Sequence, residues 1–290
     1  MWTAELAAWY EVNGRHGLPW RLTRDPWAVL VSEVMLQQTS VGRVLPRWEA
    51  FLRRWPAPSA CAAAPLDEVL REWDGLGYPR RAVALHRCAT VVARHGWPRD
   101  EAGLRSLPGV GAYTARALLA FAFDHPDVPP PRDVNLGRVA ARAALGVEAS
   151  SLVPRRLDEV LAASRPHEVS PREHAFALFD LGATVCLARR PRCEECPLAA
   201  GCRSRARMAA GGVDELQTVP ARQARYAGSM RQLRGAVLRA LLSGDAAPAT
   251  WEDLRARVRE VPAAARQGAV EEAVAGLRRD GLLGRDWPDR

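Results

Sequence analysis

The sequence predicts a mainly α-helical protein. Apolar residues recur every three or four positions through several long segments, which is the periodicity of a helix with one buried face. No stretch shows the convincing alternation of apolar and polar residues that marks a half-buried strand. Glycine and proline clusters separate the segments, as turns do. Before the cysteine-rich region, the segments expected to be helical are 27–39, 64–73, 82–95, 114–123, 134–145, 156–163 and 171–181.

The region after residue 207 is expected to be a small C-terminal helical appendage. Its first part, residues 208–217, is rich in glycine and alanine and is interpreted as a linker. Helical patterns follow at 232–242, 251–259 and 268–277. The sequence Asp280-Gly281-Leu282-Leu283-Gly284 then allows a glycine-bounded hairpin, which would make the appendage resemble a winged helix.

All 41 basic side chains are arginines, because the sequence contains no lysine. Isoleucine is also absent and asparagine occurs only at Asn13 and Asn135, a bias typical of a GC-rich genome. Whatever its origin, this composition excludes any reaction that needs a side-chain amine, such as a lysine Schiff base. Only the Met1 α-amine remains.

Charge and hydropathy place the protein among globular proteins with a polyanionic partner. The net charge is +8 and the pI is about 9.8, values that fit DNA, RNA or a membrane surface. The 290 residues, 48% of them hydrophobic, suit about two domains. The longest apolar runs fall far short of the ~18 residues of a membrane span, and no signal pattern begins the chain. We therefore expect a cytoplasmic location and no membrane association.

Four of the six cysteines form a cluster with the spacing C-x6-C-x2-C-x5-C. A reducing compartment disfavours disulfides, and four thiolates close in sequence require a positive centre. Zinc sites usually combine two short cysteine pairs, whereas this cluster has one C-x2-C between longer arms, so we favour a 4Fe-4S cluster over zinc. Cys61 and Cys88 lie in alanine-rich helical segments and are expected in the core. The predicted ligands are Cys186, Cys193, Cys196 and Cys202.

A glycine turn, Leu107-Pro108-Gly109-Val110-Gly111, opens a helix that starts near Tyr113. Backbone amides at such a helix N-terminus bind a phosphate without side-chain charge. The turn alone indicates little, because many helices are joined in this way. Here a proline-rich loop and Asp133 follow it, and the cysteine cluster follows them.

Together these features resemble the helix-hairpin-helix DNA glycosylase superfamily, and within it the MutY-like adenine glycosylases. The resemblance covers roughly residues 1–207 in the right order. Its most specific parts are the cysteine spacing and the octapeptide Ser32-Glu33-Val34-Met35-Leu36-Gln37-Gln38-Thr39. The other matching motifs are Leu18-Pro19-Trp20-Arg21, Gly75-Leu76-Gly77-Tyr78, Leu107 to Gly111, Asp133-x-Asn135 and Leu181-Gly182-Ala183.

The resemblance implies two α lobes with DNA in the cleft between them. An iron–sulfur lobe would comprise residues 1–17 and 129–207, and a six-helix lobe with the hairpin would comprise residues 18–128. The appendage, residues 208–290 with its linker, is too short and too helical to match the Nudix-like β domain with which many family members read 8-oxoguanine.

The resemblance also assigns the chemistry. It implies that Glu33 protonates N7 of adenine and that Asp133 stabilises the positive sugar. The contexts agree, because burial in an apolar helix raises the pKa of Glu33 and an N-cap position favours ionised Asp133. For each residue, a purely structural role is the alternative. Tyr113 stands where bifunctional relatives carry lysine, which implies base excision alone, and Asn135 is expected to hold Asp133 and its water.

Contacts to double-stranded DNA are implied for two further groups of residues. Gln37, Gln38 and Tyr78 are expected to contact the bases when adenine is flipped out, with Tyr78 beside the opposite purine. The hairpin turn is expected to bind phosphate, and carbonyl oxygens there offer a place for a monovalent cation. The arginine-rich cysteine loop is expected to add phosphate contacts. The predicted hairpin contacts are Leu107, Gly109, Val110 and Gly111.

The expected function is base-excision repair by a monomer that hydrolyses the N-glycosidic bond of adenine mispaired with guanine or 8-oxoguanine. A thymine or uracil mismatch glycosylase is an alternative, although the octapeptide favours adenine. A non-catalytic iron–sulfur DNA-binding protein is the alternative of another class, and intact Glu33, Asp133 and Tyr113 argue against it. Three positions depart from the family pattern, and one of them is Val134, which lies between Asp133 and Asn135 where glycine or threonine is common. Pro79 replaces a second aromatic residue and is expected to open a helix, and the charge of Arg132 is expected to affect the pKa or the loop of Asp133.

Overall fold

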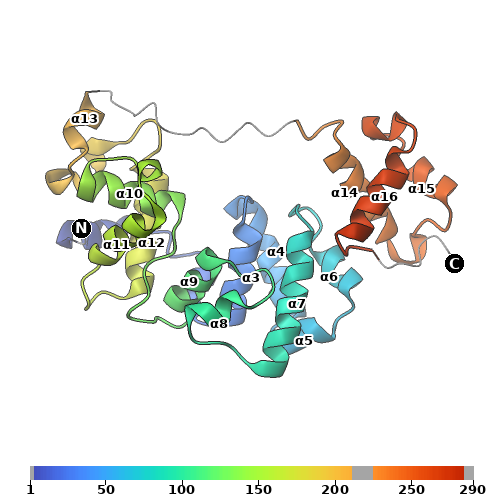
Figure 1. The fold of residues 1–290 in the computed structure, drawn as a ribbon, viewed down its shortest axis with the longest axis horizontal. Helices are drawn as coiled ribbons and strands as arrows, with labels where there is room; N and C mark the ends of the chain where they lie inside the picture. Colours follow the sequence, from blue (N-terminus) through green and yellow to red (C-terminus); the bar gives the residue numbers. More distant parts are fainter. Residues whose placement is uncertain (1–2, 211–224, 284–290) are drawn as a thin grey trace. The chain divides into compact units, whose positions relative to one another are not determined.

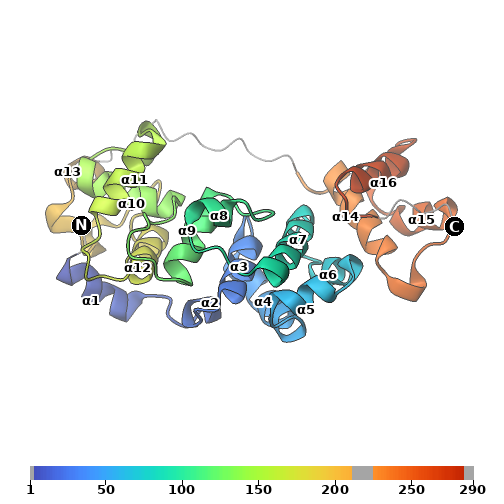
Figure 2. The same cartoon turned by 60° about the horizontal axis from the view of Figure 1, so that its bottom comes forward.

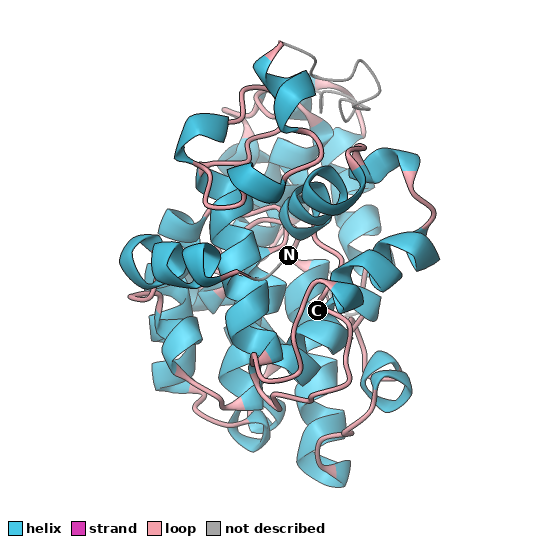
Figure 3. Ribbon diagram, turned by 90° about the vertical axis from the view of Figure 1, so that its left-hand side faces the viewer, coloured by secondary structure: helices cyan, strands magenta, loops and turns pink. Residues whose placement is uncertain are grey.

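The computed structural model describes residues 3–210 and 225–283. These ranges form helices, turns and loops and contain no β-strand, which confirms the mainly α fold class (Figure 3). No helix within them is both long and apolar enough to cross a membrane. The chain divides into two compact units, which are Met1–Glu33 with Trp97–Pro220 and Val34–Gly96 with Ala221–Arg290.

The central helix of the first unit is α12 (Pro171–Thr184), most of which is buried. It packs against α1 (Ala4–Asn13), α9 (Ala112–Phe121) and α10 (Val134–Leu145), and Figures 1 and 2 show α10 beside it from two directions. The hydroxyl of Ser170 caps its N-terminus. The other helices are α2 (Pro19–Leu22), α8 (Glu101–Arg105), α11 (Pro154–Ala163) and α13 (Arg205–Ala209), with 3-10 turns at Ala149–Ser151, Cys193–Glu195 and Ala199–Gly201. Helix α3 (Pro26–Leu36) begins in this unit and ends in the second.

Asp180 fixes the N-terminal segment to α12. Its carboxylate is fully buried and accepts hydrogen bonds from the guanidinium groups of Arg15 (2.6 Å) and Arg21 (2.7 and 3.0 Å). Burial alone would raise the pKa of Asp180, but hydrogen bonds and charges from these arginines outweigh it and hold the pKa below its ordinary value. The segment after α1 is therefore attached by a buried ion pair with a partner about 160 residues away.

The first unit includes segments that the resemblance places in the other lobe. This unit groups residues 18–33 and 97–128 with residues 129–207, whereas the predicted six-helix lobe spans residues 18–128. One physical reason is Arg172, whose guanidinium donates to the carbonyl oxygens of Phe121, Arg21 and Thr23. The lobe boundaries therefore stay a prediction, distinct from these contact-defined units.

The second unit contains α4 (Val41–Arg54), α5 (Pro58–Ala63), α6 (Leu66–Glu72) and α7 (Arg80–His95). Helix α7 packs along α5 and α6. Phe51 lies 4.8 Å from Trp55 and 6.3 Å from Trp73 between ring centroids, in edge-to-face geometry. Cys61 and Cys88 are both buried, as expected of core cysteines.

The appendage forms three helices in the described residues, as predicted. They are α14 (Met230–Leu241), α15 (Trp251–Val258) and α16 (Ala269–Arg279), with 3-10 turns at Gly244–Ala246 and Pro262–Ala265. Helix α14 packs against the other two and buries Leu233 and Val237. Asp280 ends α16, no strand starts by residue 283, and Gly284 of the expected hairpin lies outside the described residues. Of the expected linker, α13 includes the first two residues, and 211–217 lie outside the described residues.

Candidate functional site

Glu33 lies in α3, which is apolar almost throughout. Asp25 caps this helix by accepting from the amides of Trp27 (3.1 Å) and Ala28 (3.3 Å). The Glu33 side chain is buried, with 8% of the residue exposed. Burial is the main cause that raises its pKa, and the negative charge of Asp133 adds to it, so the pKa reaches about 7 despite a hydrogen bond from Tyr113. At neutral pH a large fraction of Glu33 therefore holds a proton, as its sequence context predicts.

Tyr113 lies in the first turn of α9, directly after the glycine hairpin. Gly109 adopts φ 78°, which lets the chain reverse between α8 and α9, and Gly111 caps α9 with no side chain over its amides. The Tyr113 ring is partly exposed, but its hydroxyl is surrounded by protein. Burial raises its pKa well above 10, followed by the negative charges of Glu33 and Asp133. Tyr113 therefore stays a neutral phenol that donates a hydrogen bond to Glu33.

The hairpin exposes backbone more than side chains. Leu107 and Val110 are buried, at 4% and 6% exposed, so their side chains anchor the turn. The Val110 amide donates to the Leu107 carbonyl (3.1 Å). An added Cβ at Gly111 would meet no atom within 4 Å, so the space beside this residue is open. Any phosphate contact at Leu107, Gly109, Val110 or Gly111 must therefore be made by backbone amides.

Asp133 is the N-cap residue of α10, as predicted. Its carboxylate accepts from the Asn135 amide at 2.6 Å, and its charge raises the pKa of both Glu33 and Tyr113. The first unit thus brings Glu33, Tyr113 and Asp133 within electrostatic reach of one another. Arg132 does not disturb this cap, because its guanidinium lies 3.3 Å from Asp158.

Asn135 is held by contacts that the sequence analysis did not foresee. Arg138, one turn along α10, donates to Asn135 Oδ1 (2.8 Å) and to the carbonyl oxygens of Gly182 (2.6 Å) and Cys186 (2.7 Å). An added Cβ at Gly182 would lie 2.6 Å from Asn135 Cβ, which explains the glycine in Leu181-Gly182-Ala183. Sequence spacing could have paired Arg138 with Asn135, but it could not show the contacts with Gly182 and Cys186.

Two of the four clustered thiols, those of Cys186 and Cys202, contact Arg142 near the end of α10. Arg142 donates to Cys186 Sγ (3.8 Å) and to the carbonyl oxygens of Leu187 (2.8 Å) and Ala188 (2.9 Å), and Cys202 Sγ donates to the Arg142 carbonyl (3.8 Å). Burial, and then the charges of the other thiols, raise the pKa of Cys196 to about 11. A bound positive centre would let all four ionise, so the donor set fits an iron–sulfur cluster held by cysteine thiolates. In residues 3–210 and 225–283, no three ligand-type side chains are placed to hold one metal ion.

The predicted base contacts lie in the second unit. Gln37 and Gln38 follow the end of α3 and are exposed. Tyr78 is 43% exposed and adopts φ 48°, immediately before Pro79, which opens α7 as expected. The predicted helix 27–39 is three residues too long, because α3 ends at Leu36 and Gln38 turns to φ 55°.

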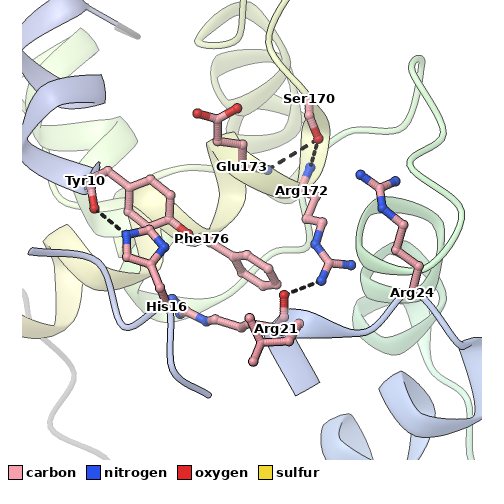
Figure 4. A pocket seen from close by; sticks show the side chains of 9 residues that line it. Tyr10, His16, Arg21, Arg24, Ser170, Arg172, Glu173 and Phe176 are labelled. Atoms are coloured by element: carbon pink, nitrogen blue, oxygen red, sulfur yellow. Dashed lines mark hydrogen bonds between the residues drawn. The ribbon is translucent and has the colours of Figure 1, made fainter. Parts of the chain in front are cut away.

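A pocket of about 240 Å³ lies in the first unit (Figure 4). Its floor is Phe176, with the guanidinium of Arg21 4.4 Å above the ring centroid. The charge of Arg21 also lowers the pKa of Glu33, so the pocket lies within electrostatic reach of the predicted acid. Of the residues that line this pocket, Arg21 alone belongs to a motif recognised in the sequence. The residues that line it are Tyr10, His16, Arg21, Leu22, Arg24, Ser170, Arg172, Glu173 and Phe176.

Two family models match the chain. The model of the HhH-GPD superfamily of base excision DNA repair proteins matches residues 31–162, and that of the iron–sulfur binding domain of endonuclease III matches residues 186–202. The fold and the site thus define a base-excision DNA repair protein with an iron–sulfur domain.

Comparison with similar proteins shows to which family of base-excision repair proteins this chain belongs. An adenine DNA glycosylase of Mycolicibacterium smegmatis is 48% identical over 238 residues, which are 81% of this chain and 78% of that protein. One of Mycobacterium tuberculosis is 47% identical over 246 residues, with 83% and 78% covered. The structure of a thermostable thymine-DNA glycosylase matches with a TM-score of 0.64 and 27% identity, covering 70% of this chain and 94% of that chain. This chain belongs to the adenine DNA glycosylase family. It is a DNA N-glycosylase of base-excision repair that acts on DNA and carries an iron–sulfur cluster.

Proposed function

We propose that this enzyme removes adenine mispaired with guanine or 8-oxoguanine, by hydrolysis, and leaves an uncleaved strand with an abasic site. The observation that carries this proposal is the electrostatic coupling of the buried Glu33 with Tyr113 and Asp133, which are partly exposed. It combines a protonated acid with a carboxylate, the pair that cleavage of a glycosidic bond through a cationic sugar requires.

The proposed reaction assigns one role to each carboxyl group. Glu33 gives its proton to N7 of adenine while the bond between the base nitrogen and C1′ of the sugar breaks. The electron pair of that bond leaves with the base, and the Asp133 carboxylate stabilises the positive sugar. A water held by Asp133 and Asn135 then adds to C1′ and gives a proton to the carboxylate of Glu33, which restores the acid. Because Arg138 fixes the amide oxygen of Asn135, its amide nitrogen is left to orient the water.

Two observations support base excision without strand cleavage. The sequence has no lysine to form a Schiff base with the sugar. Tyr113, at the corresponding hairpin position, is a neutral phenol that donates a hydrogen bond to Glu33. The remaining amine, at Met1, lies outside the described residues.

We further propose how the DNA and the cluster are held. Cys186, Cys193, Cys196 and Cys202 hold a 4Fe-4S cluster, which supplies the positive centre for their loop. The hairpin amides bind phosphate, and its carbonyl oxygens offer a site for a monovalent cation. Gln37, Gln38 and Tyr78 contact the bases beside the flipped adenine.

The pocket around Phe176 is proposed to receive the extruded adenine. It combines an aromatic ring with the polar side chains of Glu173 and Arg21, as expected for a base-binding pocket. We propose that the enzyme acts as a monomer in the bacterial cytoplasm, on nucleoid DNA.

Single-turnover base release tests this proposal directly. Duplexes would pair adenine, thymine or uracil with guanine, and adenine with 8-oxoguanine, and each reaction would be analysed with and without hot alkali. We expect adenine to be released and the strand to break only in alkali. Faster release of thymine or uracil would refute adenine specificity, and efficient scission without alkali would refute the monofunctional assignment. If Asp133→Asn released adenine as fast as wild type, the catalytic role of Asp133 would be wrong.

A further inference from the structure

One arginine of the second unit holds the end of α3. Arg81, in the first turn of α7, donates from Nη1 to the carbonyl oxygens of Val34 (2.7 Å), Met35 (3.1 Å) and Gln37 (2.6 Å). The last carbonyl groups of a helix lack partners within it. Arg81 therefore supplies hydrogen bonds where α3 ends, immediately before Gln38.

The other nitrogen of the same guanidinium holds the glycine turn that carries Tyr78. Arg81 Nη2 donates to the carbonyl oxygens of Leu76 (3.0 Å) and Gly77 (3.1 Å), and to the hydroxyl of Thr39 (3.3 Å). The Thr39 hydroxyl in turn donates to the Leu76 carbonyl (3.3 Å). One side chain thus ties together two loops that lie about 40 residues apart in sequence.

Both loops contain a residue in strained backbone geometry. Gln38 has φ 55° and Tyr78 has φ 48°, and apart from glycines only Asp124 shares this geometry in the described residues. Such conformations persist where surrounding contacts over-determine them, and they gather at functional sites. The Arg81 guanidinium lies 5.4 Å from the Tyr78 ring centroid and bonds to the residues directly before Gln38 and Tyr78.

We propose that Arg81 is a positioning residue that sets Gln37, Gln38 and Tyr78 for contact with the bases of a mispair. This inference rests on the proposed function, which gives those three residues their role. A guanidinium suits the task because its planar fork presents donors in fixed directions to several acceptors. An ammonium group at this place could not reach both loops in the same geometry, so charge alone does not replace Arg81.

The first test compares binding to mispaired and fully paired duplexes. The variants are Arg81→Met, Arg81→Lys and the control Arg80→Met. The Arg80 side chain is 74% exposed and lies 3.7 Å from Asp280 at the surface. Loss of folded protein lowers binding to both duplexes by the same factor, whereas loss of positioning lowers the preference for the mispair. We expect both Arg81 variants to lose most of that preference and the control to keep it. Equal preference in Arg81→Met and wild type would overturn the proposal.

The second test asks whether Arg81 acts through Tyr78. Single-turnover base release is measured for Arg81→Met, Tyr78→Ala and the double variant, with visible absorption and melting temperature as controls for folding. We expect each single variant to lose about 100-fold, as misplaced groups do, and the double variant to lose little more. Additive losses would contradict the proposal. If wild type releases no adenine, the proposed function fails, while the binding preference still decides whether Arg81 positions these loops.

Discussion

The pKa of Glu33 predicts how stability changes with pH. In the unfolded chain Glu33 releases its proton near 4.5, whereas burial keeps the proton bound until about pH 7 in the folded protein. The folded state therefore binds more protons between these values, and its stability falls as pH rises from about 4.5 to 7. The difference, 7 minus 4.5, corresponds to about 3 kcal/mol at ~1.36 kcal/mol per pH unit. Glu33→Gln removes this loss because glutamine does not ionise.

Apparent melting temperatures at pH 5 and pH 8 test this reasoning. Relative to wild type, Glu33→Gln is expected to gain about 6–12 °C more at pH 8 than at pH 5, taking ~2–4 °C per kcal/mol for a chain of this size. Glu49→Gln, on the exposed side of α4, is the matched control and should follow wild type. If the difference between wild type and Glu33→Gln is the same at both pH values, Glu33 is not a buried acid with a raised pKa.

Catalysis should respond to the same ionisation. The wild-type rate of single-turnover base release is expected to be level below pH 7 and to fall about tenfold per pH unit above it, because only protonated Glu33 donates. Glu33→Gln should lose about 10²–10⁴-fold below pH 7, the usual contribution of a general acid, and its rate should not fall further above pH 7. A rate that rises through pH 7 would refute the assignment of Glu33 as the acid.

Three further substitutions test the supporting structure. Gly182→Ala places a methyl group 2.6 Å from Asn135 Cβ and should cost about 1–3 kcal/mol in urea unfolding, with slower base release. Asp180→Asn leaves two arginines without their fully buried carboxylate and should cost about 3–5 kcal/mol, measured in the same way. Arg142→Lys keeps the charge but loses the fork beside Cys186, so it should weaken the visible absorption of the cluster. Arg155→Lys, at a side chain 92% exposed, should leave that absorption unchanged.

The sequence predicts most of the longer helices, and the helices it misses include α4 and α8. Helix α4 contains Pro46 and so reads as interrupted, and α8 is only 5 residues long. The predicted helix runs three residues past Leu36 because Gln37, Gln38 and Thr39 include no glycine or proline to mark its end. At the end of the helix, the guanidinium of Arg81 donates hydrogen bonds to the carbonyl oxygens of Val34 and Gln37. No local sequence pattern shows these contacts.

In the site, too, local sequence predicts single residues but not the contacts between distant segments. Local context placed Glu33 in an apolar helix and Asp133 at an N-cap, and both placements are confirmed. The pocket could not be foreseen, because it depends on Arg21 meeting α12 through Asp180, 159 residues further along the chain. Local sequence motifs therefore predict metal ligands and helix caps. They do not predict pockets, which form where segments far apart in the sequence pack together.

The absence of lysine has a structural counterpart in the interior. Arg81 and Arg172 each donate to carbonyl oxygens of separate segments. Arg142 joins the carboxylate of Glu148 to the carbonyl oxygens of Leu187 and Ala188. An ammonium group has no fixed fork, so a lysine at these positions would keep the charge and lose the geometry. Codon bias therefore explains why exposed positions such as Arg155 carry arginine, but it is not needed at these three. At these positions the guanidinium has a structural role, because its donors reach acceptors that a single ammonium group could not hold in the same geometry.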